Sequence, residues 1–232
     1  MRHELNRLVN TIADEALRKQ VADLIEGVTV EIGGVTFDGL SLDAAPAGMR
    51  QHHAYREGLI QHTVAAATIA LTLCDIIADI YHGVVDRDVV LAAVITHDLM
   101  KGHVYRVTAQ ESYGMSDLGE RVDHLSLIVA ELIRRGFPLD VVHAVAAHHG
   151  RSGPISPRTI EALVTFVADN ADATLNGEVL SAARYLLTEC AGIREASFTA
   201  THAFAIVHAK QARGCSGVAE ELAKIREGAA VV

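Results

Sequence analysis

Apolar residues recur at helical spacing along most of this chain, and the exception lies near its N-terminus. Between Leu5 and Ile25 the apolar positions are three and four residues apart, which predicts an amphipathic helix. Residues 28–32 and 35–37 then alternate between apolar and other residues on either side of Gly33-Gly34. Alternation around a Gly-Gly turn is typical of a β-hairpin, and this hairpin is the one clear strand candidate in the sequence.

After a loop at residues 43–48, helical periodicity continues almost to the end of the chain. Glycines stand where several of these segments should stop, and Ser156-Pro157 has the composition of a helix start. The pattern predicts helices near residues 57–81, 87–100, 117–135, 139–149, 157–175, 178–190, 199–212 and 217–227. We therefore expect an all-α bundle. It would comprise an N-terminal helix and hairpin (1–44), a core (45–175) and a helical C-terminal extension packed on that core (176–232).

Composition narrows the classes of function. Half of the 232 residues are hydrophobic, so a sizeable core can be buried. The formal net charge of −9, the absence of Trp and the lack of a basic run argue against nucleic acid as a partner. A small-molecule substrate suits this balance better. The helical tail leaves a homodimer open.

Neither end of the chain nor its apolar segments indicate a membrane. The first residues lack the apolar region of a signal peptide. The apolar run from Val64 to Ile80 contains Asp75 and Asp79, so we interpret it as a buried core helix rather than a membrane span. The expected location is the cytoplasm.

The cysteines give no site by their spacing. Cys74, Cys190 and Cys215 are scattered and odd in number, so they form neither a C-x-x-C zinc pattern nor a disulfide framework. We expect idle or buried thiols in a reducing compartment.

Thirteen histidines are the unusual feature of the composition. Histidine is both a metal ligand and a proton carrier near neutral pH, so its surroundings decide its role. Several of the histidines and aspartates follow strongly apolar stretches of predicted helices, where a polar side chain needs a hydrogen bond or a metal. Helical bundles build metal sites from such inward side chains on separate helices. The candidates in chain order are His62, His97, Asp98, Lys101, His124, His148, His149 and Asp169.

Residues 52–63, His-His-Ala-Tyr-Arg-Glu-Gly-Leu-Ile-Gln-His-Thr, resemble the segment that opens the HD domain of certain bacterial exoribonucleases and small archaeal proteins. The stretches His-Asp-Leu-Met-Lys at 97–101, His-His-Gly at 148–150 and Asp-Asn-Ala-Asp-Ala at 169–173 fit the same group. Over about residues 45–175 the chain thus resembles the HD superfamily of metal-dependent phosphohydrolases. No OB domain precedes this segment, unlike in the exoribonucleases, which lowers the RNA interpretation.

The resemblance implies a centre with two divalent transition metal ions. The first would be held by His62, His97, Asp98 and Asp169, and Asp98 would bridge to a second held by His124, His148 and His149. Imidazole ligands favour Fe or Mn, with Zn, Co, Ni or Mg as alternatives. Asp172 is the rival of Asp169 for its ligand role. Gly58 occupies the position of the glutamate that trinuclear relatives carry, so we expect no third metal.

The resemblance also implies catalytic and substrate-binding roles. Asp98 and Lys101 would be catalytic, with Lys101 supplying positive charge to a phosphate oxygen, although Met100 replaces the small residue usual before this lysine. A basic and hydrogen-bonding cluster suits a phosphate ester, and the candidate substrate-binding residues are His53, Tyr55, Arg56 and His103. The alternatives stay open: a solvated lysine at a helix end, packing roles for His53 and Tyr55, and a surface-loop histidine at 103.

The leading hypothesis is a dinuclear phosphodiesterase that acts on a small (cyclic) phosphate ester of a nucleotide or pterin. One alternative is a mononuclear nucleotide phosphomonoesterase, against which the additional ligands His124, His148 and His149 argue. A di-iron oxygenase rests on family analogy alone. A non-catalytic nucleotide-binding HD module is disfavoured by the intact ligand set.

Overall fold

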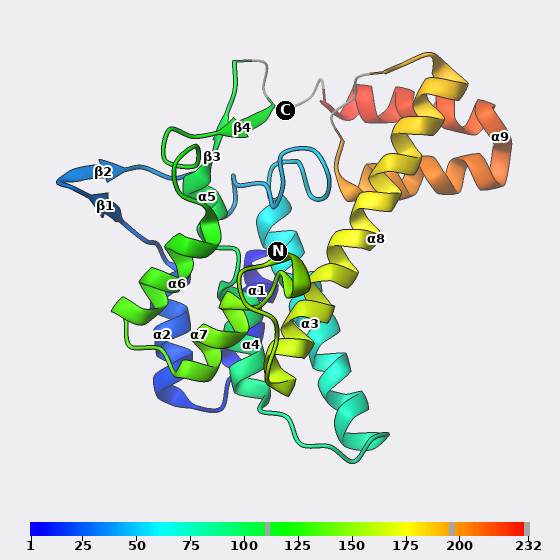
Figure 1. The fold of residues 1–232 in the computed structure, drawn as a ribbon. Helices are drawn as coiled ribbons and strands as arrows, with labels where there is room; N and C mark the ends of the chain where they lie inside the picture. Colours follow the sequence, from blue (N-terminus) through cyan, green and yellow to red (C-terminus); the bar gives the residue numbers. More distant parts are fainter. Residues whose placement is uncertain (110–111, 195–197, 230–232) are drawn as a thin grey trace.

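Helices make up most of the chain that the computed structural model describes, namely residues 1–109, 112–194 and 198–229 (Figure 1). Two short antiparallel strand pairs accompany them, which confirms the all-α prediction. The elements in chain order are α1 (Arg2–Asn10), α2 (Glu15–Ile25), β1 (Val30–Ile32), β2 (Val35–Phe37), α3 (Gly58–Asp79), α4 (Arg87–Thr96), α5 (Lys101–Val104), β3 (Tyr105–Val107), β4 (Tyr113–Met115), α6 (His124–Arg134), α7 (Leu139–Ala146), a 3₁₀ turn (Gly150–Ser152), α8 (Ile160–Ala191) and α9 (Ala200–Ala229).

The N-terminal segment differs from the prediction in one respect. The single helix expected between Leu5 and Ile25 is two helices, because Asp14 starts α2 as an N-cap whose carboxylate accepts from the backbone N–H groups of Ala16 and Leu17. The hairpin is confirmed: β1 pairs with β2, and Ile32 stands opposite Val35 across the Gly-Gly turn. The second strand pair, β3 with β4, was missed, since three-residue strands carry too few positions to show alternation.

The centre of the main core is α4, which is buried at every position from Val89 to Thr96. This helix packs against α2, α3, α7 and α8, and these neighbours shield Val89–Thr96 from solvent on all sides. Several predicted helices are longer than the observed ones near this centre. Instead of 87–100, 117–135 and 139–149, the helices α4, α6 and α7 end at Thr96, begin at His124 and end at Ala146. Five candidate site residues therefore lie at or just beyond helix ends, namely His97, Asp98, His124, His148 and His149.

The helix boundaries from residue 157 onward also differ from the predicted ones. The expected helices 157–175 and 178–190 are one helix, α8, and its N-cap is Thr159 rather than Ser156. Asn176 and Gly177 predict a break because both are poor helix formers, at about 1 kcal/mol or less each. Buried Asn176 instead accepts a 2.6 Å hydrogen bond from the His53 backbone, and this tertiary contact holds the helix through that point.

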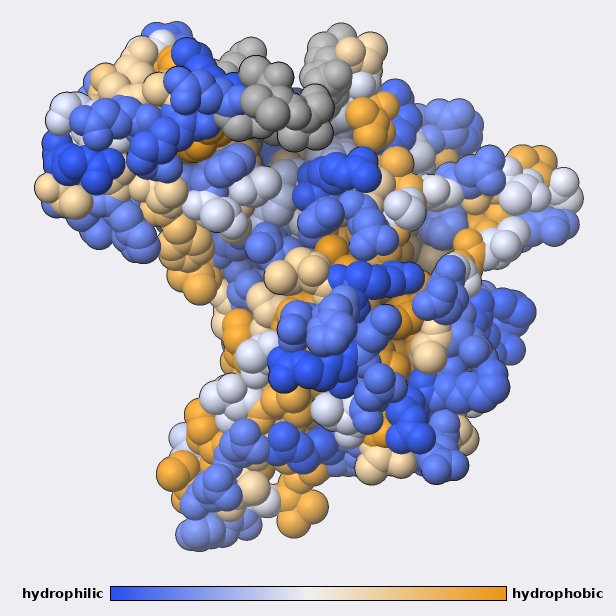
Figure 2. Space-filling view, turned by 180° about the vertical axis from the view of Figure 1, so that it is seen from behind, coloured by the Kyte–Doolittle hydropathy of each residue, from blue (hydrophilic) through white to orange (hydrophobic). Residues whose placement is uncertain are grey.

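The second half of α8 and all of α9 make a separate small core, which we call the C-terminal hairpin (residues 177–194 and 198–229). Its α9 bends at Gly214, where φ is 68° and ψ is −154°. Its buried residues include Leu180, Leu187, Ile206 and Val218. Figure 2 shows the hairpin as a lobe set off from the main helices, with the molecule hollowed along the flank between them. The predicted boundary at 175/176 falls within the continuous α8 and stays a prediction.

One described helix, α3, is long and apolar enough by composition alone to cross a membrane. It packs against α1, α4 and α8, and its first turns are buried within the protein.

Candidate metal centre

The seven metal-ligand candidates of the sequence come together where α3, α4, α6, α7 and α8 meet. His62 lies on α3 and Asp169 on α8, whereas the other five stand at or just beyond helix ends. Three groups each have ligand atoms within 4.8 Å of one another: His62, His97 and Asp169; His97, Asp98 and His148; and His124, His148 and His149. The structure therefore places all seven in one cluster.

Asp98 stands in the middle of this cluster, and its two oxygens face different histidines. Oδ2 lies 3.5 Å from Nε2 of His62 and 3.3 Å from Nε2 of His97. Oδ1 lies 3.3 Å from Nε2 of His124 and 3.8 Å from Nε2 of His148. Asp169 belongs to the first side, with Oδ1 3.1 Å from Nε2 of His62. One carboxylate thus stands between two groups of histidines.

Three of the histidines are oriented by their Nδ1 atoms. His97 and His148 each direct Nδ1 to the carbonyl oxygen three residues earlier, at 2.7 Å, and those carbonyls belong to Val94 and Val145. In His62 the same atom lies 2.6 Å from Oδ2 of Asp172. A hydrogen bond at one ring nitrogen fixes the tautomer and leaves the other nitrogen free to bind metal.

Some buried polar atoms of the cluster have no hydrogen-bond partner among the described residues. They are Nε2 of His124, Nε2 of His148 and Oδ1 of Asp98. An unsatisfied polar atom in a protein interior is costly, at roughly 1–3 kcal/mol each. These three atoms converge on one another, so the donor set fits a cation between them.

Electrostatics divides the cluster into two sides. Burial disfavours a charged imidazole, and it lowers the pKa of His124 to about 4 and that of His148 to about 3. For His97 burial is outweighed by Asp98 and Asp169, which raise its pKa to about 9. Asp98 is likewise buried, yet His97 and Lys101 hold its pKa well below the usual value. The second side thus offers neutral imidazoles, the form that binds metal.

Asp172, the rival for the Asp169 position, has a different role in the structure. Its Oδ2 accepts from both Nδ1 of His62, at 2.6 Å, and Nε2 of His53, at 2.8 Å. The hydroxyl of Tyr55 lies 2.8 Å from Nδ1 of the same His53 and donates to Gln61 at 2.5 Å. Asp172, His53 and Tyr55 therefore form a buried chain behind His62 rather than a part of the cluster itself.

The segment before α3 has unusual backbone geometry. His53 and Glu57 have left-handed φ values of 45° and 65°, which are uncommon for residues other than glycine and often occur at functional sites. A Cβ at Gly58 would lie 2.0 Å from the carbonyl oxygen of His53. A side chain at this position would require the backbone to shift, and the neighbouring Glu57 is exposed.

The remaining predicted residues are distributed over the molecule. Nζ of the buried Lys101 lies 2.5 Å from Oδ2 of Asp98, at the cluster. Arg56 is exposed on the turn before α3, and Tyr55 is buried in the core of the C-terminal hairpin. His103 lies away from the cluster, because its Nε2 donates to the Val28 carbonyl at 3.1 Å. His103 lines a cavity of about 350 Å³ with the β1–β2 hairpin and α2.

One residue of the site was not among the predicted site residues. The ring of His52 lies 5.3 Å from that of His62, and its buried Nδ1 has no partner in the described chain. Burial and the positive charge of Lys101 lower the pKa of His52 to about 4. The sequence signal was present, since His52 begins the same motif, but nothing in the spacing separates it from His53.

The sequence comparisons were consistent with this geometry. The chain matches the family described as HD domain over residues 59–174. It is 38% identical over 172 residues to the dihydroneopterin 2′,3′-cyclic phosphate phosphodiesterase of Methanocaldococcus jannaschii, which covers 74% of this chain and 69% of that protein.

The 3′-5′ exoribonucleases YhaM are more distant relatives. The Bacillus subtilis protein is 32% identical over 142 residues, covering 56% of this chain and 43% of the exoribonuclease. The Listeria monocytogenes protein (strain EGD-e) gives the same identity and coverage. The chain thus spans less than half of these exoribonucleases. No solved structure matches the chain significantly.

Proposed function

The chain belongs to the HD domain family of metal-dependent phosphohydrolases, and we propose that it is a dinuclear phosphodiesterase acting on a small-molecule cyclic phosphate ester. The observation that carries the proposal is the position of Asp98. Its two oxygens face two separate groups of histidines, at 3.3–3.5 Å on one side and 3.3–3.8 Å on the other. A mononuclear site would need only the first of these groups.

The donor set suggests how two ions would be held. The first would take His62, His97 and Asp169, the second would take His124, His148 and His149, and Asp98 would serve both. A pair of divalent cations supplies an activated water and stabilises charge on the phosphoryl oxygens. The five imidazoles among the candidate ligands favour Fe or Mn over Mg, which prefers oxygen ligands.

The residues of the chain itself would bind and orient the ester. Lys101 carries a buried positive charge at the cluster, where it can interact with a phosphate oxygen once Asp98 is engaged elsewhere. The ring of His52 lies beside that of His62, and its buried Nδ1 has no partner in the described chain, so His52 is a candidate for a second hydrogen bond with the substrate. Asp172 and His53 hold His62 in the orientation that directs Nε2 toward Asp98 and Asp169.

The substrate class follows from charge and from the relatives together. The Methanocaldococcus protein acts, by its name, on the cyclic phosphate of a reduced pterin. The YhaM proteins act on RNA, but this chain has a net charge of −9 and lacks a basic run. We therefore propose a 2′,3′-cyclic phosphate of a pterin or nucleotide rather than a polynucleotide.

The test is metal stoichiometry combined with cyclic phosphate hydrolysis. After anaerobic loading with Mn(II) or Fe(II), we expect about two ions per chain by elemental analysis and conversion of a pterin or nucleoside 2′,3′-cyclic phosphate to its monoester. His148→Ala should lose one ion and the activity. His143→Ala is the matched control, because Nε2 of His143 accepts from the Arg158 backbone at 3.0 Å, outside the cluster.

The opposite result is equally specific. Binding of one ion by the wild-type protein, together with release of phosphate from nucleoside monophosphates and no attack on cyclic phosphates, would replace this proposal with a mononuclear phosphomonoesterase.

A further inference from the structure

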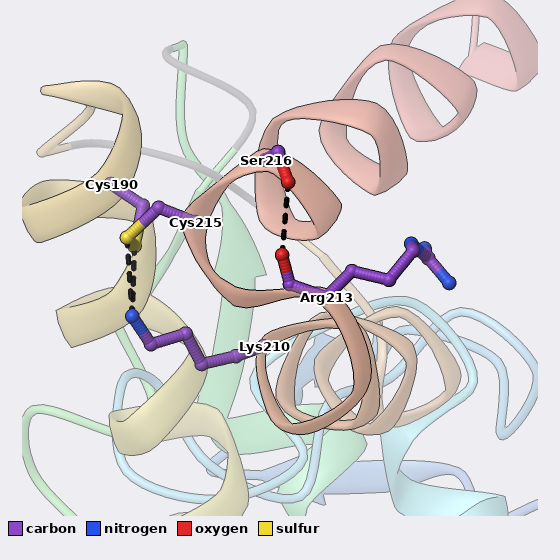
Figure 3. Close-up of a disulfide and its surroundings, with 5 residues drawn as sticks. All are labelled: Cys190, Lys210, Arg213, Cys215 and Ser216. Carbon is purple, nitrogen blue, oxygen red and sulfur yellow. Dashed lines mark hydrogen bonds between the residues drawn. A yellow bond between two sulfur atoms is a disulfide. The ribbon is translucent and has the colours of Figure 1, made fainter.

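The C-terminal hairpin contains a disulfide that the cysteine spacing did not predict. Cys190, in the last turn of α8, is bonded to Cys215, directly after the bend of α9 at Gly214 (Figure 3). The expectation of three idle thiols was therefore wrong for this pair and holds for the buried Cys74 alone. The reason is spatial, because the fold returns α9 alongside α8 and brings together two cysteines 25 positions apart.

The surroundings of this disulfide differ from those of a purely structural bond. The ammonium group of Lys210 lies 3.1 Å from Sγ of Cys215 and 3.7 Å from Sγ of Cys190. Cys215 is exposed and Cys190 half-buried, so both sulfurs are near solvent. A cation beside a sulfur stabilises the thiolate, and the thiolate is both the attacking and the leaving species in thiol–disulfide exchange.

Cys74 provides the contrast within the same molecule. It is fully buried in the main core, and burial raises its pKa. The charge of Arg87 lowers the pKa of Cys74 less than burial raises it, and no described hydrogen bond places a cation on this sulfur. One chain thus contains an inert thiol and an accessible sulfur pair with an adjacent cation.

We propose that Cys190, Cys215 and Lys210 form a thiol–disulfide exchange site for a low-molecular-weight thiol and its disulfide. In the reducing direction a thiolate attacks Sγ of the exposed Cys215, the S–S bond breaks, and Cys190 leaves as a thiolate near Lys210. A second thiolate attacks the sulfur of the added thiol in the mixed disulfide and releases Cys215. The net reaction converts the protein disulfide and two thiols into the protein dithiol and one small disulfide.

The Cys190–Cys215 disulfide constrains the C-terminal hairpin, against which Tyr55 packs. Tyr55 is buried in the hairpin core with Leu187 and Val218, although it lies in the segment before α3. Its hydroxyl also accepts from Asn176 at 3.2 Å. Opening the disulfide removes a covalent constraint from α8 and α9, so we expect the hairpin to open locally and Tyr55 to become more mobile with it.

The first part of the test measures the thiols of the full-length protein. Purified without reductant and then denatured, it should show one reactive thiol, Cys74, and after dithiothreitol it should show three. Hydrogen exchange of α9 and of the segment around Tyr55 should accelerate in the reduced form. For a closed loop of this length the local opening should rise on the order of 100-fold. Three thiols before reduction, or unchanged exchange after it, would overturn the proposal.

The second part tests the role of the cation. Reduced protein is mixed with glutathione disulfide, and formation of the Cys190–Cys215 bond is followed by mass spectrometry of peptides. Lys210→Met should slow the reaction by roughly tenfold. Arg213→Met is the matched control, since it removes a positive charge from the same helix, yet Arg213 points away from the sulfurs (Figure 3). Its guanidinium pairs with Glu220 at 3.2 Å. Equal rates for the two variants would show that Lys210 does not activate the sulfurs.

Discussion

The two halves of α8 show how differently the main core and the C-terminal hairpin are built. In the first half, up to Asn176, the inward positions include polar as well as apolar side chains: Asp169 and Asp172 contact His62 on α3, and Asn176 contacts the His53 backbone before α3. In the second half they carry Leu180 and Leu187, which contact only an apolar core. Burial of polar groups disfavours folding unless they are paired, whereas burial of leucine favours it. The candidate site residues of α8 therefore lie in the half where buried polar groups have to be paired.

The two regions meet at Tyr55. Its ring belongs to the hairpin core, and its hydroxyl belongs to the polar chain that leads through His53 and Asp172 to His62. Substitutions on either side of this residue should separate effects on chemistry from effects on stability.

The largest effect is expected for Asp98→Asn. Asp98 faces histidines on both sides of the cluster, and an amide cannot bridge two cations as a carboxylate does. The variant should lose both metal ions and all measurable turnover while its circular dichroism stays helical. Elemental analysis and a cyclic phosphate assay provide the measurement. Glu189→Gln makes the same change of charge on the exposed surface of the hairpin and should change neither quantity. An Asp98→Asn protein that kept its metals would remove the basis for the dinuclear centre.

Lys101→Met should have the next largest effect. The substitution removes a buried positive charge at the cluster but no predicted ligand. We expect turnover to fall by roughly 10²–10³-fold with the metal content unchanged, by analogy with the loss of one donor to a developing oxyanion. Lys224→Met, a surface change in the hairpin, serves as the comparison. If both variants turned over equally fast, Lys101 would be a helix-end lysine without a catalytic role.

Asp172→Asn tests the polar chain between the two regions. An amide at this position can still contact His62 and His53 but carries no negative charge to hold both rings. Loss of such an outer partner typically lowers metal affinity or activity by about 10–100-fold. Metal titration would measure the loss of affinity, and steady-state kinetics would measure the loss of activity. Glu178→Gln, on the exposed face of the same helix, is the control. A complete loss of one ion would instead mean that Asp172 is a ligand.

The sequence indicated which polar residues lie together better than it indicated where the helices end. The candidate ligands were identified because histidines and aspartates in apolar surroundings are rare and because their order along the chain resembles one family, and their role as ligands stays a prediction. The residue types did not predict the helix ends in the same way. Leu99 and Met100 continue the apolar spacing of α4 although the helix ends at Thr96, and His97 and Asp98 lie buried at this helix end.

Other features depend on contacts between distant segments. The continuity of α8 through Asn176 follows from its hydrogen bond to His53, which lies 123 positions away. The choice between Asp169 and Asp172 requires knowing which carboxylate faces Nε2 of His62 and which faces Nδ1. The pairing of Cys190 with Cys215 requires the fold of the hairpin. None of these has a local signal in the sequence.

The smallest effect on turnover is expected for Leu187→Ala, which changes the hairpin alone. Leu187 is fully buried there, and truncation of a buried leucine typically costs about 2–5 kcal/mol. With the disulfide reduced, this loss should appear as faster hydrogen exchange of α9. The metal content should be retained, because none of the candidate ligands lies among the described residues of the hairpin. Ile128→Ala in the main core is the matched truncation and should lower the thermal midpoint of the whole protein instead. If Leu187→Ala released the metals as well, the hairpin and the metal-binding helices would unfold as one cooperative unit. Tyr55 would then transmit the stability of the hairpin directly to His62.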